Sequence, residues 1–333
     1  MSRLKTLVRN ERGMPPLRSG HSLCQGCGIP MVVRTVLDSI EGPKVVVSAT
    51  GCLEVATTRY PTTAWNVPWL HVAFENAAAT ASGIETAYRA LRRRGRLPQD
   101  GPLTFVVFAG DGGTYDIGLQ SLSGALERGH RFIFVCYDNQ AYMNTGVQRS
   151  GATPPAARTA TTPAVGEEPG NKFGQGKNVP LIAMAHEIPY VATATVADLR
   201  DLEYKAARAM DFRGARYLHI LVPCPLGWGS APADTIKVAR LATESGLFPV
   251  FEAEDGEVVS ATPIRHRVPV TDYLRTQARY AHLFRPAERT RIIARIQAAA
   301  DRNIARFGLL ESPDDSERVV PAPPGRAHHA GGR

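Results

Sequence analysis

The chain has 333 residues, of which 44% are hydrophobic, and it carries a formal net charge of +8. A chain of this length can bury a full core, as one large α/β domain with extensions or as two domains, and no apolar run reaches the ~18 residues that would predict a membrane span. The polar, basic first ten residues predict no secretory signal. We therefore expect a cytoplasmic protein without a membrane partner.

Apolar segments rich in β-branched residues alternate with helical segments over the first 230 residues. The predicted strands are 45–49, 103–109, 131–137, 190–194 and 216–222, and the predicted helices are 30–40, 76–94, 117–128 and 196–212. This alternation predicts a mostly parallel sheet with helices on both faces. Because parallel strands end at one edge, polar residues that follow different strands are expected to meet there.

The arginine-rich segment 92–96 follows one of these helices and contains Gly95. Cations in the last turn and a glycine as the stop signal identify it as a helix end. The positive charge would also fit nucleic acid or an acidic protein partner, and composition does not separate these readings. We expect no nucleic-acid partner.

Segments outside the predicted sheet divide the rest of the chain. Residues 144–180 are rich in Thr, Pro and Gly, and a loop of this length at the ligand edge is expected to cover a cofactor. Its Lys172 and Lys177 could face phosphates or solvent. We place a cofactor-binding domain at residues 1–230, a C-terminal helical extension at 231–311, with helices near 235–243 and 287–306, and a disordered tail at 312–333.

A glycine-rich turn with an acid follows the second predicted strand, and an asparagine follows the third. Glycines let the backbone approach an anion, and the next helix offers free N–H groups. Asp111 would repel a phosphate but is suited to hold Mg²⁺, with Asn139 and a nearby backbone carbonyl as further oxygen ligands. The alternative is an ordinary turn. The residues predicted for this diphosphate and Mg²⁺ site are Gly110, Asp111, Gly112, Gly113, Asn139 and Ala141.

Four of the five cysteines lie on or near the same predicted edge. Cys24 and Cys27 form a Cys-x-x-Cys pair, whereas Cys52 and Cys224 each follow a strand. In a reducing compartment such thiols are more typical of metal ligands than of disulfides. Four thiolates from one loop and two strand ends suit a [4Fe–4S] cluster, and zinc stays open. Cys136 lies within a strand and is expected to be an inert core thiol.

The pairing of Gly-Asp-Gly with an asparagine on the next strand resembles the thiamine diphosphate motif of thiamine enzymes, which implies Asp111 and Asn139 as Mg²⁺ ligands. The segments "GHSLCQGCG", "ATGCLEV", "HVAFENAAATASGIETA", "FAGDGGTYDIGLQSLSGALERG", "YDNQAYMNTGVQRSGATP" and "ILVPCPLGW" extend the similarity over residues 20–229. They resemble the β subunit of 2-oxoacid:ferredoxin oxidoreductases of the pyruvate synthase type. Weaker similarity continues to about residue 283.

This resemblance implies the thiamine-diphosphate-binding fold, with thiamine diphosphate and Mg²⁺ beside a [4Fe–4S] cluster. It places Asn144 near the cofactor or substrate. Ile29 departs from relatives that carry a polar residue at that position. The cluster ligands that it implies are Cys24, Cys27, Cys52 and Cys224.

The resemblance also implies an activity and partners. It implies a catalytic β subunit that oxidatively decarboxylates a 2-oxoacid to acyl-CoA and CO₂ and passes the electrons to ferredoxin. Pyruvate is the first expectation for the 2-oxoacid, and the reaction could also run in reverse as a carboxylation. Partner subunits of α, γ and δ type are implied, and the C-terminal extension is expected to pack on the complex. The glutamate that activates the thiamine is expected from a partner subunit. Glu75 is expected to start a helix instead.

Several alternatives stay open. The substrate could be a branched-chain or aryl 2-oxoacid, and the enzyme could be a non-redox thiamine decarboxylase. The protein could instead be a zinc-stabilised nucleic-acid-binding module, which would use the cysteines but leave the Asp111–Asn139 pair unexplained. His21 and Thr50 could hydrogen-bond the cluster or cofactor, or be structural. Trp65 and Trp69 could shield the cluster or simply pack. The pair His328–His329 could bind metal, although a solvated tail is the simpler reading.

Overall fold

The computed structural model describes residues 14–97 and 103–310, so the predicted tail and its histidine pair lie outside the described residues. The strands are β1 (Lys44–Ala49), β2 (Trp69–Val72), β3 (Thr104–Gly110), β4 (Phe132–Asp138), β5 (Tyr190–Thr195), β6 (Arg216–Leu221), β7 (Phe251–Glu254) and β8 (Glu257–Ala261). The α-helices are α1 (Ile29–Ser39), α2 (Cys52–Thr57), α3 (Ala77–Arg93), α4 (Leu119–Glu127), α5 (Val179–Met184), α6 (Leu199–Arg208), α7 (Pro225–Trp228), α8 (Thr235–Glu244), α9 (Val270–Arg275) and α10 (Thr290–Phe307). In this part of the chain, no helix combines the length and the apolarity that a bilayer crossing needs.

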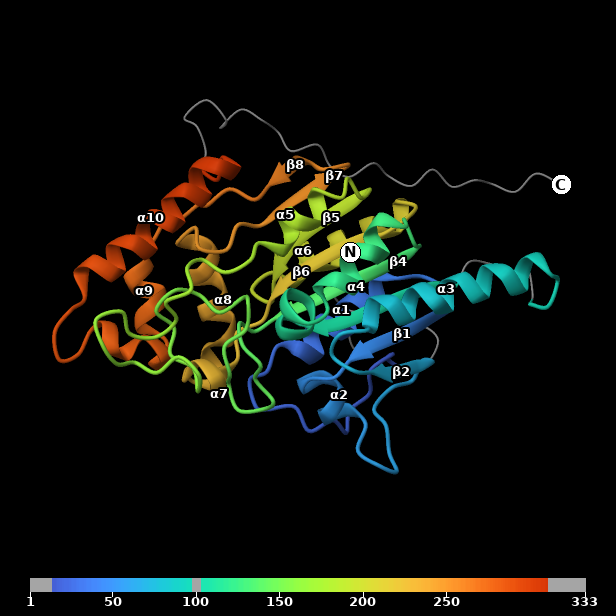
Figure 1. Ribbon diagram of the computed structural model, residues 1–333, viewed down its shortest axis with the longest axis horizontal. Helices are drawn as coiled ribbons and strands as arrows, with labels where there is room; N and C mark the ends of the chain where they lie inside the picture. Colours follow the sequence, from blue (N-terminus) through green and yellow to red (C-terminus); the bar gives the residue numbers. More distant parts are fainter. Residues whose placement is uncertain (1–13, 98–102, 311–333) are drawn as a thin grey trace.

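The strands form one sheet in the order β2-β1-β3-β4-β6-β5-β7-β8 (Figure 1). The first six strands of this order run parallel, and β7 and β8 are antiparallel additions. The five predicted strands are all present, each within one or two residues of its expected bounds. The predicted mostly parallel sheet is therefore confirmed.

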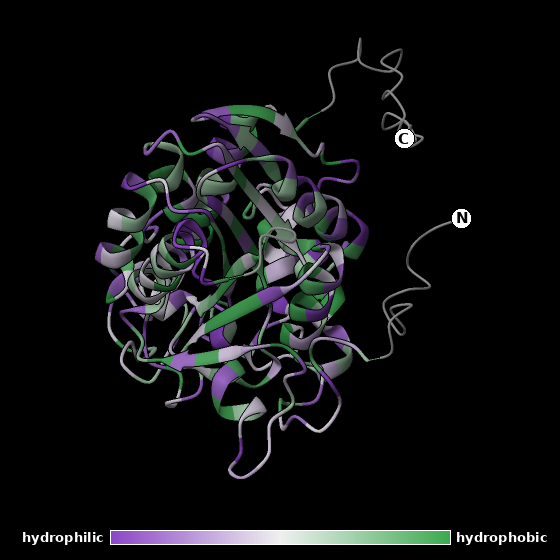
Figure 2. Ribbon diagram, turned by 90° about the vertical axis from the view of Figure 1, so that its right-hand side faces the viewer, coloured by the Kyte–Doolittle hydropathy of each residue, from purple (hydrophilic) through white to green (hydrophobic). Residues whose placement is uncertain are grey.

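Helices cover both faces of the sheet and bury two separate cores. Alternate side chains of β4 enter opposite cores: Ile133, Val135 and Tyr137 join the core under α1 and α6, whereas Phe134 and Cys136 join the core under α3, α4 and α5. Figure 2 shows hydrophobic stretches along the central strands and hydrophilic residues mainly on the surrounding helices and loops. The period of two along β4 is what lets one strand supply both layers.

The arginine-rich segment ends α3 as predicted. Arg92 and Arg93 occupy the last turn, and Gly95 adopts a φ of +67° as its N–H donates to the carbonyl of Arg92 over 2.9 Å. A left-handed residue at this point is the usual end of a helix, and glycine adopts it without a steric cost.

The C-terminal region contains more than helices. Figure 1 shows α8, α9 and α10 gathered at one end of the molecule, where they share a third core with the fully buried Trp228. The β7–β8 hairpin, which the sequence analysis missed, joins the main sheet through β5. The domain boundary expected at residue 230 stays a prediction.

Candidate functional site

A pocket of about 40 Å³ lies at the carboxyl ends of β1, β3 and β4, where the sequence predicted a ligand site. Each residue predicted to bind the cofactor lines it. Its lining consists of Thr50, Gly51, Cys52, Phe74, Gly110, Asp111, Gly112, Gly113, Tyr137, Asn139, Ala141, Tyr142, Met143, Asn144 and Thr145. Asn144 is exposed at the surface, so it stands at the rim of this pocket rather than on its floor.

The acid of the glycine-rich segment already has helical backbone angles. After β3, Asp111 has φ −59° and ψ −40°, and the π-helical turn η2 (Gly112–Asp116) follows at once. The sequence analysis expected a turn here and a helix only from residue 117. The glycines are required by close packing, because an added Cβ at Gly112 would overlap the Tyr142 ring and one at Gly118 would overlap the Gly113 carbonyl.

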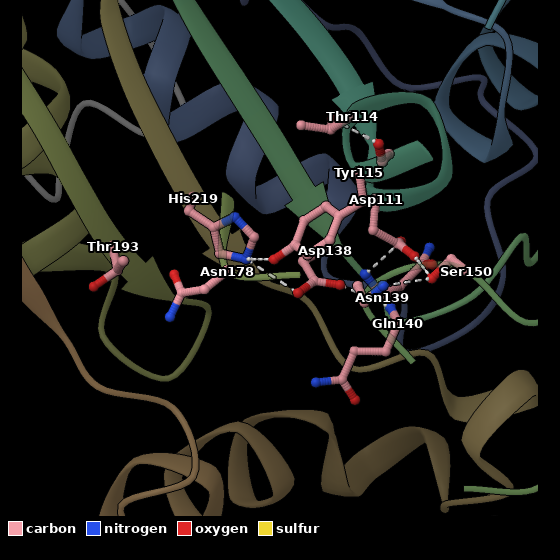
Figure 3. A network of polar contacts seen from close by, with 12 residues as sticks. Asp111, Thr114, Tyr115, Asp138, Asn139, Gln140, Ser150, Asn178, Thr193 and His219 are labelled. Atoms are coloured by element: carbon pink, nitrogen blue, oxygen red, sulfur yellow. Dashed lines mark hydrogen bonds and ion pairs between the residues drawn. The ribbon is translucent and has the colours of Figure 1, made fainter. Parts of the chain in front are cut away.

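Asp111 is fully buried and is held by two donors (Figure 3). The hydroxyl of Ser150 donates to its Oδ2 over 2.5 Å, and the backbone N–H of Asn139 donates to its Oδ1 over 3.2 Å. Burial raises the pKa of Asp111 well above its usual range and the neighbouring Asp138 raises it further, while the Ser150 hydrogen bond lowers it. A buried carboxylate with only neutral donors is stabilised strongly by a cation.

Three oxygen atoms converge beside Asp111. The side-chain oxygen of Asn139 lies 3.0 Å from Asp111 Oδ1 and 2.9 Å from the Ala141 carbonyl oxygen. All three are acceptors, so this arrangement is unfavourable unless a cation lies among them or the carboxamide turns to present its NH₂ group. Adjacent oxygens around Mg²⁺ with bonds of 2.0–2.1 Å are about 2.8–3.0 Å apart. The spacing and the donor set therefore fit Mg²⁺.

The Cys-x-x-Cys loop is fastened to a segment that lies much later in the chain, at the start of α8. Its turn is closed by the N–H of Cys27, which donates to the carbonyl of Cys24 over 3.0 Å, and Gly26 adopts a φ of +76° directly against the Pro232 backbone. The hydroxyl of Thr235 donates to the Gly26 carbonyl over 2.7 Å. This loop is thus positioned by the start of α8, although more than 200 residues separate the two in the sequence.

The two remaining cysteines of the predicted set follow β1 and β6 and begin short helices. Cys52 is the first residue of α2. Cys224 caps α7, where its sulfur accepts a hydrogen bond from the N–H of Gly227 over 3.4 Å.

The four thiols act on one another electrostatically. Burial is the main cause that raises the pKa of Cys27 and of Cys52 to about 12, and the thiol groups of Cys224 and Cys24 contribute to that rise. In the described part of the chain, no three His, Cys, Asp or Glu side chains are spaced as ligands of a single metal ion. Four sulfurs on one zinc ion would be about 3.8 Å apart, whereas a four-iron cube binds each thiolate at a separate corner. The cysteine ligand set and the kind of metal centre stay predictions.

Residues for which the sequence left two roles open have structural contacts. Thr50 Oγ1 lies 2.8 Å from His71 Nε2 and donates to the Val72 carbonyl over 3.1 Å. Trp65 stacks on Trp69 with a centroid distance of 5.8 Å. These contacts favour packing and strand pairing as roles for Thr50 and Trp65.

His21 and Glu75 differ in their surroundings. The Nδ1 atom of His21 is buried and has no partner among the described residues, and burial lowers the pKa of this histidine. Glu75 is exposed and directly precedes Asn76, the N-cap of α3. The expectation that Glu75 starts a helix fits this position.

The long loop covers the acid of the glycine-rich segment. It supplies Ser150 to Asp111 and Asn144 to the pocket. Lys177 does not line this pocket: its Nζ lies 2.7 Å from Asp116 Oδ1. Lys172 is exposed. Cys136 is fully buried, and burial raises the pKa of its thiol well above the ordinary range, as expected for an inert core thiol.

A polar network that the sequence analysis missed lies on the other side of Asn139 (Figure 3). His219 Nε2 lies 3.0 Å from Asp138 Oδ2 and 3.3 Å from the Tyr115 hydroxyl, and its Nδ1 lies 3.0 Å from the Tyr217 hydroxyl. These side chains come from η2, β4 and β6. Only the fold reveals the network, since Asp138, Tyr217 and His219 read as ordinary strand residues and Tyr115 reads as part of the glycine-rich turn.

The fold and site together define a thiamine diphosphate-binding domain. Residues 49–220 match the family described as "Thiamine pyrophosphate enzyme, C-terminal TPP binding domain". The chain is 52% identical over 268 residues to pyruvate synthase subunit PorB of Methanothermobacter marburgensis, covering 80% of this chain and 90% of that one. It therefore belongs to the family of 2-oxoacid:ferredoxin oxidoreductase β subunits represented by PorB, which confirms the resemblance seen in the sequence.

Other similar proteins add to this assignment. Ketoisovalerate oxidoreductase subunit VorB of Pyrococcus abyssi is 40% identical over 267 residues, which cover 80% of this chain and 85% of that protein. The structure of 2-oxoglutarate:ferredoxin oxidoreductase from Magnetococcus marinus superposes with a TM-score of 0.52 at 22% identity, covering 70% of this chain and 82% of that one. The structural likeness confirms the fold. A zinc-stabilised nucleic-acid-binding module is not supported.

Proposed function

We propose that this chain is the catalytic β subunit of a 2-oxoacid:ferredoxin oxidoreductase that acts on pyruvate, forming acetyl-CoA and CO₂ with ferredoxin as electron acceptor. The observation that carries the proposal is the shared pocket: Cys52 lines the same cavity as Asp111, Asn139 and Ala141. A diphosphate cofactor held at the three oxygens would therefore lie beside a cysteine of the candidate cluster. The 52% identity to a pyruvate synthase subunit supports pyruvate as the substrate.

The candidate cofactors have separate binding groups in this chain. Asp111 Oδ1, Asn139 Oδ1 and the Ala141 carbonyl would hold Mg²⁺, and the glycine N–H groups at the start of η2 would face the diphosphate. The thiolates of the four cysteines would hold the cluster. When bound, thiamine diphosphate supplies the electron sink for decarboxylation and the cluster supplies a one-electron carrier.

Asp116 fixes the loop that closes over these groups. Its Oδ2 accepts from the Gly151 N–H over 2.8 Å and from the Tyr142 hydroxyl over 3.3 Å, and its Oδ1 pairs with Lys177. The Tyr142 hydroxyl also lies 3.2 Å from the Gly112 carbonyl oxygen. These contacts hold the loop against η2, where it excludes water from Asp111.

The proposal includes partner subunits of α, γ and δ type and a cytoplasmic location. The pocket of this chain is lined by no glutamate among the described residues, and Glu75 lies exposed outside it. The carboxylate that activates thiamine would therefore come from a partner, so the isolated chain is expected to be inactive. Coenzyme A and the substrate carboxylate would likewise be bound mainly by other subunits.

Reconstitution of the complex tests the assignment. We expect ferredoxin reduction that requires pyruvate, coenzyme A, thiamine diphosphate and Mg²⁺, with a higher kcat/KM for pyruvate than for 2-oxoisovalerate or phenylglyoxylate. Incorporation of labelled CO₂ into pyruvate with reduced ferredoxin would test the reverse direction. A preference for 2-oxoisovalerate would overturn the substrate, and pyruvate decarboxylation without electron transfer would overturn the redox assignment.

A further inference from the structure

The hydroxyl of Tyr137 stands at the boundary between the two candidate cofactor sites. Tyr137 is near the end of β4 and is 1% exposed. Its ring packs below the end of β3, since a Cβ added at Gly110 would lie 3.2 Å from its Cε2 atom. Its hydroxyl reaches the β1–α2 junction, since a Cβ added at Gly51 would lie 3.0 Å from the hydroxyl oxygen. The two glycines make room for this side chain.

This hydroxyl has no hydrogen-bond partner among the described residues. The backbone N–H of Leu53 faces the oxygen but does not reach hydrogen-bond geometry. Buried tyrosine hydroxyls usually find a partner, and a hydroxyl has one hydrogen to donate. Tyr137 lines the pocket, so its free O–H group points to an acceptor that binds there.

The surroundings of Tyr137 identify that acceptor. Cys52 follows Gly51 directly and lines the same pocket as Tyr137, and after burial its thiol is the largest cause of the raised pKa of the phenol. Both Cys52 and Cys27 pack against the core that contains Tyr137. Asp111, a candidate Mg²⁺ ligand, has a weaker effect on the pKa of the phenol than Cys52 does.

We propose that Tyr137 is a positioning residue for the cluster, and that its hydroxyl donates a hydrogen bond to the sulfur of Cys52 when that sulfur is an iron-bound thiolate. This inference rests on the cluster of the proposed function. A hydrogen bond to a ligand sulfur stabilises the more negative, reduced cluster, and so raises the reduction potential. Tyr137 would thereby help to set how readily the cluster accepts an electron.

The test is a redox titration of the cluster in the intact complex, followed by electron paramagnetic resonance. In Tyr137→Phe we expect an approximately tenfold shift of the reduction equilibrium toward the oxidised cluster, which is about 59 mV more negative for one electron. Replacement of Tyr137 by 3,5-difluorotyrosine, a stronger donor of the same shape, should move the potential in the opposite direction. This second variant keeps the hydroxyl and tests the idea even if the phenylalanine variant folds poorly.

Tyr190→Phe is the matched control. Tyr190 is also fully buried in the same core, but it is the first residue of β5 and lies away from the strand ends that form the pocket. Its hydroxyl donates to Glu252. It should lower the melting temperature and leave the potential unchanged.

The outcomes separate this inference from the proposed function. An unchanged reduction potential in Tyr137→Phe, with normal iron content, would overturn only the role of Tyr137. If thiamine affinity were lost while the potential stayed unchanged, the hydroxyl would be assigned to the thiamine cofactor instead. A wild-type complex without iron would overturn the cluster itself.

Discussion

Two buried polar clusters of this chain are built in opposite ways. Between β5 and β7, Glu252 accepts from the Tyr190 hydroxyl and from Arg208, each over 2.6 Å, and Arg208 also reaches Glu254. At the ligand edge, the side-chain oxygen of Asn139 faces Asp111 Oδ1 and the Ala141 carbonyl oxygen, although two donors also hold Asp111, and the thiols of Cys24, Cys27 and Cys224 act on Cys52. The free-energy cost of burying a polar group is large when the group lacks a hydrogen-bond partner and small when it has one. Like groups buried together thus mark a binding site, whereas complementary groups mark the scaffold.

Cys52→Ser should have the largest effect, because on the proposed ligand set it removes one corner of the cluster. We expect the iron content and the brown colour of the purified complex to fall to near the level of a metal-free preparation, with loss of ferredoxin reduction. Iron analysis and the visible spectrum measure this. Cys136→Ala is the control: Cys136 lies in the core and should leave iron unchanged. Full iron content in Cys52→Ser would show that the ligand set is wrong.

Asp111→Asn separates cofactor binding from stability. The amide cannot supply a charged oxygen to Mg²⁺, so we expect Mg²⁺-dependent binding of thiamine diphosphate to weaken by at least about a hundredfold. The cofactor-free protein should melt at the same temperature or higher, because a neutral amide is less costly to bury than a carboxylate. Calorimetric titration and thermal melts measure the two effects. Unaltered cofactor affinity would contradict the three-oxygen site.

Glu252→Gln makes the same chemical change in the paired cluster and should have the reverse outcome. Glu252 loses its charge next to Arg208, so we expect a loss of about 2 kcal/mol in the free energy of unfolding. Thiamine and iron content should stay normal. Chemical denaturation of the cofactor-free chain measures the free energy of unfolding, and cofactor analysis of the complex measures the thiamine and iron content. Loss of cofactor in this variant would mean that the two clusters are coupled.

Ser150→Ala should have the smallest effect. Its hydroxyl donates to Asp111 Oδ2, and loss of a group that supports a metal ligand typically weakens binding by about tenfold. The Ser150 hydrogen bond lowers the pKa of Asp111. Without it, Asp111 takes up a proton at higher pH, and the proton competes with Mg²⁺. The affinity deficit should therefore be larger at pH 6 than at pH 8.

Titration of Mg²⁺ and thiamine diphosphate at the two pH values checks the Ser150 prediction. Ser123→Ala is the control, because it removes a hydroxyl of α4 that lies near His186 instead. An equal deficit at both pH values would mean that Ser150 acts through loop packing rather than through the charge of Asp111.

The sequence predicts the centre of this fold better than its borders. Strands buried on both faces, such as β3 and β4, are long apolar runs and were predicted almost to the residue. The strands that it missed lie toward the two margins of the sheet: β2 has four residues after a proline-rich segment, and β8 is largely exposed. Short, partly solvated strands carry little periodic signal, because pairing rather than composition defines them.

The same limit applies to the site. Asp111, Asn139 and the four cysteines could be named as candidates because each follows a strand or belongs to a recognisable spacing. Ser150 and Tyr137 could not, since one lies in a long loop without periodicity and the other looks like any aromatic residue of a strand. Their roles depend on how far a side chain reaches in three dimensions, which one-dimensional patterns do not specify.

The fastening of the Cys24–Cys27 loop to Pro232 and Thr235 has a consequence for biogenesis. On the proposed ligand set, the first two thiols emerge early in translation, whereas Cys224 and the clamp at the start of α8 emerge about 200 residues later. Iron would then have no complete binding pocket on a nascent or truncated polypeptide. Cluster insertion would be a late maturation event, which protects the cell from half-made subunits that carry reactive iron.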